Sequence, residues 1–190
     1  MEVNDAIARR RSIRKYKGDP IDEKVLKQVL EAARIAPSWA NTQCWRLVVV
    51  KDKAIKEQLA GTMFAFRGGV NQTAEGMKTA PVAIAFCAEK GKSGYSYQEP
   101  KQAVTDKGEY WYMFDAALAM ENFCLAAVAA GLGTVIIGAF DPKAAAKVLN
   151  VPEGYAVVAL TPLGYPDEAP APRPRKEMSE IVFTNQFGTK

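Results

Sequence analysis

The chain has 190 residues, a formal net charge of +4 and 48% hydrophobic residues. This size and composition predict one globular domain over residues 1–190, with a core large enough to need no disulfide or structural metal. Histidine is absent, which excludes Ser-His-Asp and Cys-His nucleophilic sites and His-ligated metals. The three cysteines are widely spaced and no apolar signal segment follows Met1, so we expect reduced thiols and a cytoplasmic protein.

Capping residues and apolar periodicity predict two helices at the start of the chain. Asn4 is expected to cap a short helix that runs toward Arg11. Asp22 is expected to cap a second helix, because apolar residues over 25–33 recur at helical spacing. Pro37 cannot continue a helix and is expected to end this one.

The middle of the chain alternates regular and irregular segments. Residues 61–78 and 90–107 are polar, contain glycine and are only weakly periodic, so we interpret them as surface segments or short mobile helices. The regular segments are strands predicted at 47–50, 81–88 and 155–163, and helices predicted at 55–60 and 142–148.

Residues 109–130 form an almost wholly apolar run that predicts a long helix ended by Gly131. Asp115, Glu121 and Asn122 interrupt the run, so we do not expect it to span a membrane. A helix that is apolar on all faces must be covered on all faces, and a second copy of the chain would supply that cover. The run therefore predicts a dimer.

The chain from Pro166 to Pro174 is rich in proline and is predicted to be extended. Residues 166–190 would form an arm that carries the C-terminal residues away from the domain. Within this arm, residues 181–183 are interpreted as a strand that could add to another sheet.

Two cationic segments lie near opposite ends of the chain. Residues 9–17 hold six Lys and Arg around Ser12, which by itself favours a solvated charged face or a nucleic-acid patch. Arg173 and Arg175 flank Pro174, and a period of two in an extended segment directs both side chains to one side. Two guanidiniums presented together suit a phosphate better than a duplex. The small total charge also argues against nucleic acid.

Four motifs then occur in order along the chain. They are Arg10-Arg11-Ser12-Ile13-Arg14, then Ala36-Pro37-Ser38-Trp39-Ala40-Asn41-Thr42-Gln43-Cys44-Trp45, then Gly131-Leu132-Gly133-Thr134 with Ile137-Gly138-Ala139-Phe140, and finally Arg173-Pro174-Arg175-Lys176. Together they resemble the nitroreductase family over nearly the whole chain. The resemblance implies an α+β fold, with a mixed or antiparallel central sheet flanked by helices. It also implies an intertwined homodimer that exchanges its C-terminal tails and binds FMN at its interface.

The resemblance also implies which residues bind FMN. Arg10, Ser12, Arg173 and Arg175 would hold the phosphate and neighbouring ribityl oxygens. Arg14 would lie near the pyrimidine side of the ring, where a permanent cation stabilises the negative charge of the reduced flavin. The full set implied is Arg10, Arg11, Ser12, Arg14, Pro37, Ser38, Asn41, Gln43, Ile137, Gly138, Ala139, Arg173 and Arg175.

Some of these assignments have structural alternatives. Pro37, Ser38 and Asn41 resemble a loop that covers the flavin from the partner subunit, and Gln43 would bond a ring edge. Ser38 could instead serve a helix-end turn and Asn41 a bond to the loop backbone. The backbone at residues 137–139 would approach flavin N5, whereas Gly138 by itself also fits a strand kink.

Two functions from different classes remain open. In the first, NAD(P)H reduces FMN, which then reduces a nitroaromatic, a quinone or a similar small acceptor, so that no side chain performs the chemistry. In the second, the protein binds flavin without reductase turnover, as a store, a redox sensor or an enzyme that consumes the flavin. Four aromatic residues in the irregular segments are candidates to line an acceptor pocket: Phe64, Phe66, Tyr95 and Tyr97.

Overall fold

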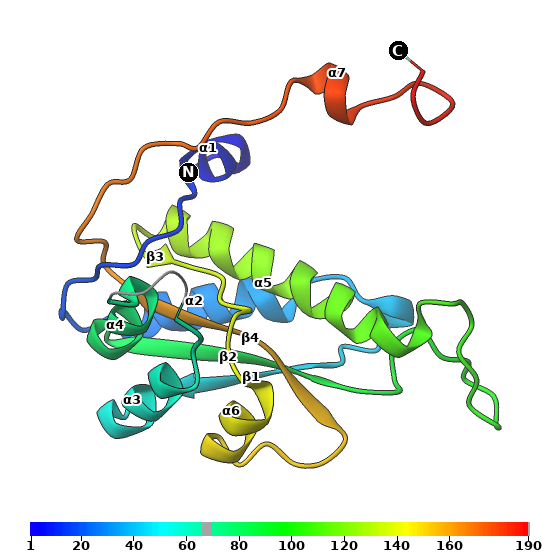
Figure 1. The fold of residues 1–190 in the computed structure, drawn as a ribbon, viewed down its shortest axis with the longest axis horizontal. Helices are drawn as coiled ribbons and strands as arrows, with labels where there is room; N and C mark the ends of the chain where they lie inside the picture. The colour runs from blue at the N-terminus through cyan, green and yellow to red at the C-terminus, as the bar shows by residue number, and fades with distance from the viewer. Residues whose placement is uncertain (66–69, 190) are drawn as a thin grey trace.

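The computed structural model describes residues 1–65 and 70–189, so that Phe66 lies outside the described residues. The described chain is α+β, as expected (Figure 1). The strands are β1 (Trp45–Val50), β2 (Val82–Glu89), β3 (Gly133–Thr134) and β4 (Tyr155–Gly164). The helices are α1 (Val3–Arg9), α2 (Glu23–Arg34), α3 (Lys53–Gly61), α4 (Gln72–Thr79), α5 (Trp111–Ala129), α6 (Pro142–Val148) and α7 (Met178–Ile181), with 3-10 turns η1 (Trp39–Asn41) and η2 (Gly108–Tyr110).

The sheet has the strand order β1-β2-β4-β3, and every neighbouring pair is antiparallel. Helices cover both faces: α5 and α2 pack on one face, and α3, α4 and α6 lie on the other (Figure 1). Successive residues of β2 therefore enter different cores, with Ile84 and Phe86 in one and Ala83 and Ala85 in the other. This explains why β2 is apolar without alternation.

Helix α5 is the main helix of the first core. Its buried face includes Ala119 and Phe123, and the Phe123 ring meets Phe86 edge-on with 5.5 Å between the ring centroids. Among the described residues, one helical segment, 108–129, is long and apolar enough to cross a membrane by length and composition alone. Its packing against the sheet accounts for much of that apolar character. Met113 and Phe114 nevertheless remain about half exposed, at 45% and 57%.

Most predicted elements are confirmed, because their caps and periodicity act locally. The Asp22 carboxylate accepts hydrogen bonds from the Lys24 and Val25 N–H groups at the start of α2. Asp141 caps α6 in the same way, with Pro142 in the first turn as expected.

Two predictions, one about element ends and one about element type, are wrong. Asn4 lies inside α1 instead of capping it, and the helix ends at Arg9, before Arg11, since residues 12–14 turn to pair with β3. Residues 178–181 form α7, whose Glu177 and Glu180 make a reciprocal capping box, so residues 181–183 are not a strand. The interpretation of residues 61–78 allowed a short helix, and α4 is such a helix, beginning after Asn71, which caps it.

Candidate functional site

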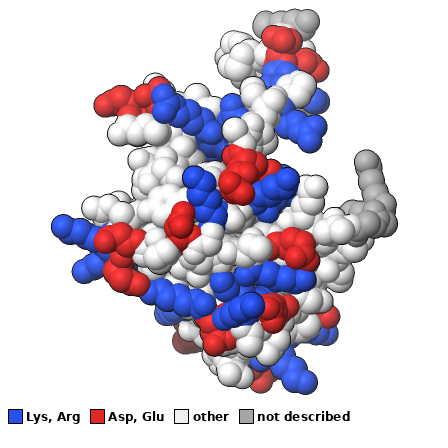
Figure 2. Space-filling view, turned by 90° about the vertical axis from the view of Figure 1, so that its left-hand side faces the viewer, with Lys and Arg blue, Asp and Glu red and all other residues white. Residues whose placement is uncertain are grey.

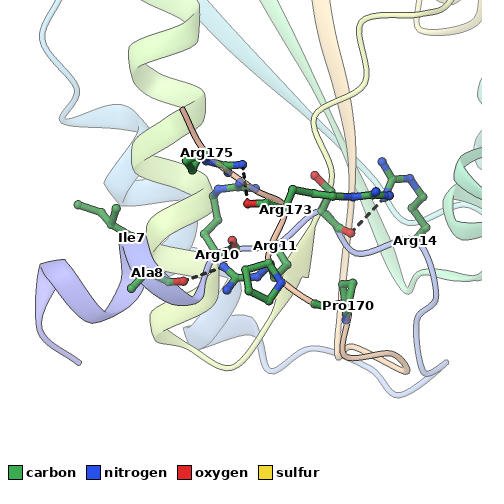
Figure 3. Close-up of a pocket in the computed structure, with 11 residues that line it drawn as sticks. Ile7, Ala8, Arg10, Arg11, Arg14, Pro170, Arg173 and Arg175 are labelled. Atoms are coloured by element: carbon green, nitrogen blue, oxygen red, sulfur yellow. Dashed lines mark hydrogen bonds between the residues drawn. The ribbon is translucent and has the colours of Figure 1, made fainter. Parts of the chain in front are cut away.

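The arginine segment after α1 and the arginine pair of the arm enclose one cavity of about 410 Å³, here called the cationic cavity (Figure 3). The structure thus brings together two segments that are more than 150 residues apart in the chain. The residues that line the cationic cavity are Ile7, Ala8, Arg10, Arg11, Ser12, Arg14, Pro170, Ala171, Pro172, Arg173 and Arg175. The high density of guanidinium groups favours an anionic ligand.

Backbone pairing fixes the arginine segment beside the sheet. Ser12 forms a bridge with Thr134 of β3, and the Ile13 N–H donates to the Thr134 carbonyl oxygen at 2.9 Å. Gly133 permits this approach, because a Cβ there would lie 2.8 Å from the Ile13 side chain. The segment therefore has one defined position next to β3.

The start of the arm is tied to the same segment. The Glu168 carboxylate accepts hydrogen bonds from the backbone N–H groups of Arg14 and Lys15. The Asp167 N–H donates to the Lys15 carbonyl oxygen at 3.0 Å, and Tyr16 bridges Pro166. These contacts explain how the arm, although extended, returns to α1 before it leaves the domain.

The arginines of the cationic cavity differ in what holds them. Arg11 donates to the Ala8 and Arg10 carbonyl oxygens at 2.7 and 2.8 Å, so its guanidinium satisfies the C-terminal end of α1. Arg14 donates from Nε to Thr73 Oγ1 at 3.2 Å and from a terminal nitrogen to the Ser12 carbonyl oxygen at 3.3 Å. Arg175 donates weakly to the Arg173 carbonyl oxygen at 3.3 Å. Arg14 is therefore the one of these cations that is oriented by a side chain from another element, Thr73 of α4.

Arg14 also lines a second cavity of about 230 Å³, here called the peptide-lined cavity. Its wall includes the chain after β3, where Ile137 exchanges backbone hydrogen bonds with Leu160 at 2.9 and 3.0 Å. The exposed Gly138 N–H donates to no acceptor among the described residues. The other lining residues are Met63, Phe64, Asn71, Thr73, Val135, Ile136, Ile137 and Ala139.

The four loop residues expected from the partner subunit, Pro37, Ser38, Asn41 and Gln43, line neither cavity in the protomer. Their loop packs on the N-terminal end of α5, through contacts with Trp111. By contrast, the C-terminal end of α5 lies near Arg11, because Val128 and Arg11 line a common surface hollow. A helix of 19 residues spans about 28 Å. One protomer therefore does not bring this loop to the cationic cavity.

Sequence reasoning found some lining residues and missed others. Phe64 does line the peptide-lined cavity, and its N–H donates to the Ala139 carbonyl oxygen. Tyr95 and Tyr97 lie elsewhere: Tyr97 donates to the loop carbonyl of Ala40 at 3.0 Å. The missed residues are Met63, Asn71, Thr73 and Val135. Of these, Asn71 carried a usable signal, because an Asn before a helix marks a position beside the helix N-terminus.

The pKa values of two cysteine thiols and one tyrosine hydroxyl are raised, so these groups are weak nucleophiles. Burial raises the pKa of the Cys44 thiol, and burial likewise raises the pKa of Cys124 to about 11, so both remain protonated near neutral pH. Burial, with the nearby Glu168 carboxylate, raises the pKa of Tyr16. Within residues 1–65 and 70–189, no cluster of three or more Cys, Asp and Glu side chains could hold a metal ion. The site therefore offers cations and backbone donors in place of a nucleophile.

The face of the molecule drawn in Figure 2 carries both charge signs. Figure 2 shows Asp and Glu side chains interspersed among Lys and Arg on the face that it presents. A uniformly basic surface would be expected for a protein that binds nucleic acid through its backbone phosphates. On this face, therefore, the cations do not form one extended basic surface.

An antiparallel sheet covered on both faces, with a cationic cavity beside its edge strand β3, defines an α+β protein. The sequence profile described as "Nitroreductase family" matches residues 7–165. The chain belongs to the nitroreductase family.

Three curated relatives illustrate the range of this family. The chain is 31% identical to an NADH dehydrogenase of Thermus thermophilus, with 96% of each chain covered. It is 31% identical to a 5,6-dimethylbenzimidazole synthase of Rhodospirillum rubrum, covering 86% of this chain and 82% of the relative. It is 29% identical to an FMN reductase (NAD(P)H) of Bacillus subtilis, covering 92% of this chain and 70% of the relative.

Solved structures agree with the fold. A crystal structure of a nitroreductase family protein from Clostridium novyi is similar to this chain, with a TM-score of 0.76 at 30% identity. The similarity covers 100% of this chain and 96% of that chain. The fold implied by the four motifs is therefore confirmed.

Proposed function

We propose that the protein is an FMN-dependent oxidoreductase that passes electrons from NAD(P)H to a nitroaromatic, a quinone or a similar small acceptor. The observation that carries this proposal is the pair of adjoining cavities that share Arg14, one rich in guanidiniums and one walled by backbone. A ligand with a phosphate at one end and a flat polar ring at the other would match both: the phosphate suits the guanidiniums, and the ring suits the backbone-walled cavity. The names of two relatives, an FMN reductase and an NADH dehydrogenase, support the same reading.

The cationic cavity fits the FMN phosphate. Arg10, Ser12, Arg173 and Arg175 would hold the phosphate and the neighbouring oxygens, since guanidiniums and a hydroxyl are donors that a dianion accepts from. Arg11 borders the cavity but its guanidinium is engaged with the end of α1. Its contribution would therefore be through the electrostatic field more than through direct contact.

The peptide-lined cavity fits the ring. Gly138 is exposed and a Cβ there would meet nothing within 4 Å, so the wall is open to a planar group. The Gly138 N–H and the Ile137 and Ala139 peptides would face that group, and Arg14, held by Thr73, would stabilise negative charge on it. When bound, FMN supplies the two-electron chemistry between NAD(P)H and the acceptor. The chain's own role is to bind, orient and stabilise charge.

A second protomer would complete the site. Residues 37–43 lie at the far end of α5 from the arginine segment, so Pro37, Ser38, Asn41 and Gln43 reach a flavin only in a partner subunit. The half-exposed Met113 and Phe114 of α5 give a dimer an apolar surface to bury. We accordingly propose a homodimer, located in the cytoplasm, that uses no metal and binds neither nucleic acid nor a membrane.

Cofactor analysis and steady-state kinetics test this function. The purified protein should have a flavin absorption band and release FMN on denaturation. It should oxidise NADH or NADPH in the presence of a nitro or quinone acceptor. A colourless protein that takes up no added FMN would contradict the proposal.

The alternative, flavin binding without reductase turnover, remains a second candidate. One relative is a 5,6-dimethylbenzimidazole synthase, so the family contains more than one activity. Binding of FMN together with negligible NAD(P)H oxidation across several acceptors would favour this alternative. Chemical reduction of the FMN complex, followed by exposure to oxygen and mass spectrometry of the flavin, would then identify consumption of the cofactor.

A further inference from the structure

Asp115 is a buried carboxylate to which the proposed mechanism gives no role. It lies in the second turn of α5 and is 1% exposed. Both of its carboxylate oxygens lie 3.1 Å from the Trp39 N–H, and the Cys44 thiol lies 3.8 Å from one of them. No Lys or Arg pairs with it among the described residues. A buried carboxyl group with so few donors makes each of them important to stability.

The loop that Asp115 contacts has an unfavourable backbone conformation. Ala40, Asn41 and Gln43 have positive φ angles of 42°, 57° and 47°. The left-handed region disfavours side chains, so such residues persist only where the surroundings hold them there. The loop therefore depends on its anchors.

The anchors include the Tyr97 hydroxyl, which donates to the Ala40 carbonyl oxygen, and the Thr42 hydroxyl, which lies 2.6 Å from the Ser93 hydroxyl. The Gln43 N–H donates to Ser38 Oγ at 2.9 Å, which closes the loop on itself. The Trp39 ring meets Trp111 edge-on, with 4.8 Å between the ring centroids, and Trp111 lies one turn before Asp115 on α5. Of these contacts, the hydrogen bond to Asp115 ties the loop backbone to a carboxyl group that is itself buried in α5.

We infer that Asp115 is a positioning residue that holds residues 38–43 in the conformation that presents Asn41 and Gln43. The side chains of these two residues are exposed and hydrogen-bond to each other at 3.2 Å, so they project together from the loop. The inference deepens the proposed function and rests on it, because Asn41 and Gln43 are there assigned to the flavin of the partner subunit. Asp115 itself, being buried, touches neither flavin nor acceptor.

The test compares Asp115→Ala and Asp115→Asn with the wild type as full-length protein. Hydrogen exchange followed by mass spectrometry reports on the amides of residues 39–43 without requiring bound flavin. We expect faster exchange there in Asp115→Ala and an intermediate rate in Asp115→Asn, because the amide retains one oxygen acceptor. The dissociation constant of FMN should rise about tenfold in Asp115→Ala and be partly restored in Asp115→Asn.

Asn122→Ala is the matched control. It removes a hydrogen bond from the same helix to the Ala32 carbonyl oxygen of α2 (3.2 Å) and leaves the loop untouched. It should lower the thermal midpoint without changing exchange at residues 39–43. If Asp115→Ala does not fold, Asp115→Asn decides the question by the same exchange measurement.

The outcomes separate this inference from the proposed function. If hydrogen exchange at residues 39–43 is the same in both Asp115 variants as in the wild type, the positioning role is overturned, whatever the dissociation constant of FMN. A wild type that binds no FMN would contradict the proposed function. Faster loop exchange with unchanged FMN affinity would place the loop outside the flavin site and overturn the inference.

Discussion

Arg14 joins the two cavities and connects the sequence motif to the proposed chemistry. Its guanidinium is oriented by Thr73 on α4 and by the Ser12 carbonyl oxygen, and its backbone N–H is fixed by Glu168. A guanidinium does not deprotonate at physiological pH, so it can stabilise an anionic ring at all working conditions. Arg10, Arg173 and Arg175 have fewer such restraints, which suits a phosphate that needs charge more than a fixed angle.

Replacement of a cavity arginine should weaken cofactor retention. Arg173→Ala removes one charge-assisted contact worth about 1.5–3 kcal/mol, so the dissociation constant of FMN should rise roughly 10- to 150-fold. Lys17→Ala is the control, because it changes the net charge equally and lines neither cavity. Fluorescence titration of apoprotein measures both. If Arg173→Ala and the control bind FMN with equal affinity, Arg173 does not contact the phosphate and the phosphate site does not include this part of the arm.

At the scale of elements, two glycines allow the arginine segment to lie between β3 and α4. Gly133 faces Ile13, and Gly76 on α4 approaches the Arg14 backbone so closely that a Cβ would lie 2.4 Å from its carbonyl oxygen. The neighbouring atom is backbone and cannot move aside without displacing the segment. The position of Arg14 therefore depends on the absence of a side chain at Gly76 as well as on the acceptor that Thr73 provides.

Gly76→Ala should destabilise the protein despite the better helix propensity of alanine. We expect a loss of about 1–3 kcal/mol in the free energy of unfolding from this overpacking, together with weaker FMN binding. Gly61→Ala in α3 is the matched control, since a Cβ there meets nothing within 4 Å. That change should be neutral or stabilising by up to about 1 kcal/mol. Urea unfolding that ranks the two variants equally would contradict the close contact.

At the scale of the whole molecule, the arm has little of its own domain to pack on. Residues 171–182 are all exposed, and Ile181 and Val182 are more than half exposed. Figure 1 shows the arm passing α1 and then leaving the body of the protein. Together with the exposed face of α5, this geometry is what a subunit that exchanges its tail with a partner would present.

Deletion of residues 178–190 tests whether the arm links assembly to cofactor binding. The deletion keeps Arg173 and Arg175 but removes α7, so it should lower both dimer stability and FMN affinity through a shared equilibrium. Sedimentation velocity and FMN titration at several protein concentrations measure the two effects. A truncated protein that remains a dimer with unchanged FMN affinity would make the arm a passive extension.

The sequence by itself predicted most of the local elements and several residues of the candidate site. The Asp22 and Asp141 caps and the apolar periods act within a few residues, so they could be read directly. The expectation that Arg10, Arg14, Arg173 and Arg175 share one ligand also followed from sequence, and all four line one cavity.

Only the tertiary structure decided where these parts meet. The end of α1 is set by pairing of Ser12 with Thr134, and the role of Asp115 is set by contact with Trp39, 76 residues earlier. Thr73 and Asn71 line the peptide-lined cavity because α4 packs beside Arg14. Such contacts form between segments distant in the chain, and their energies depend on burial and geometry that no local pattern encodes.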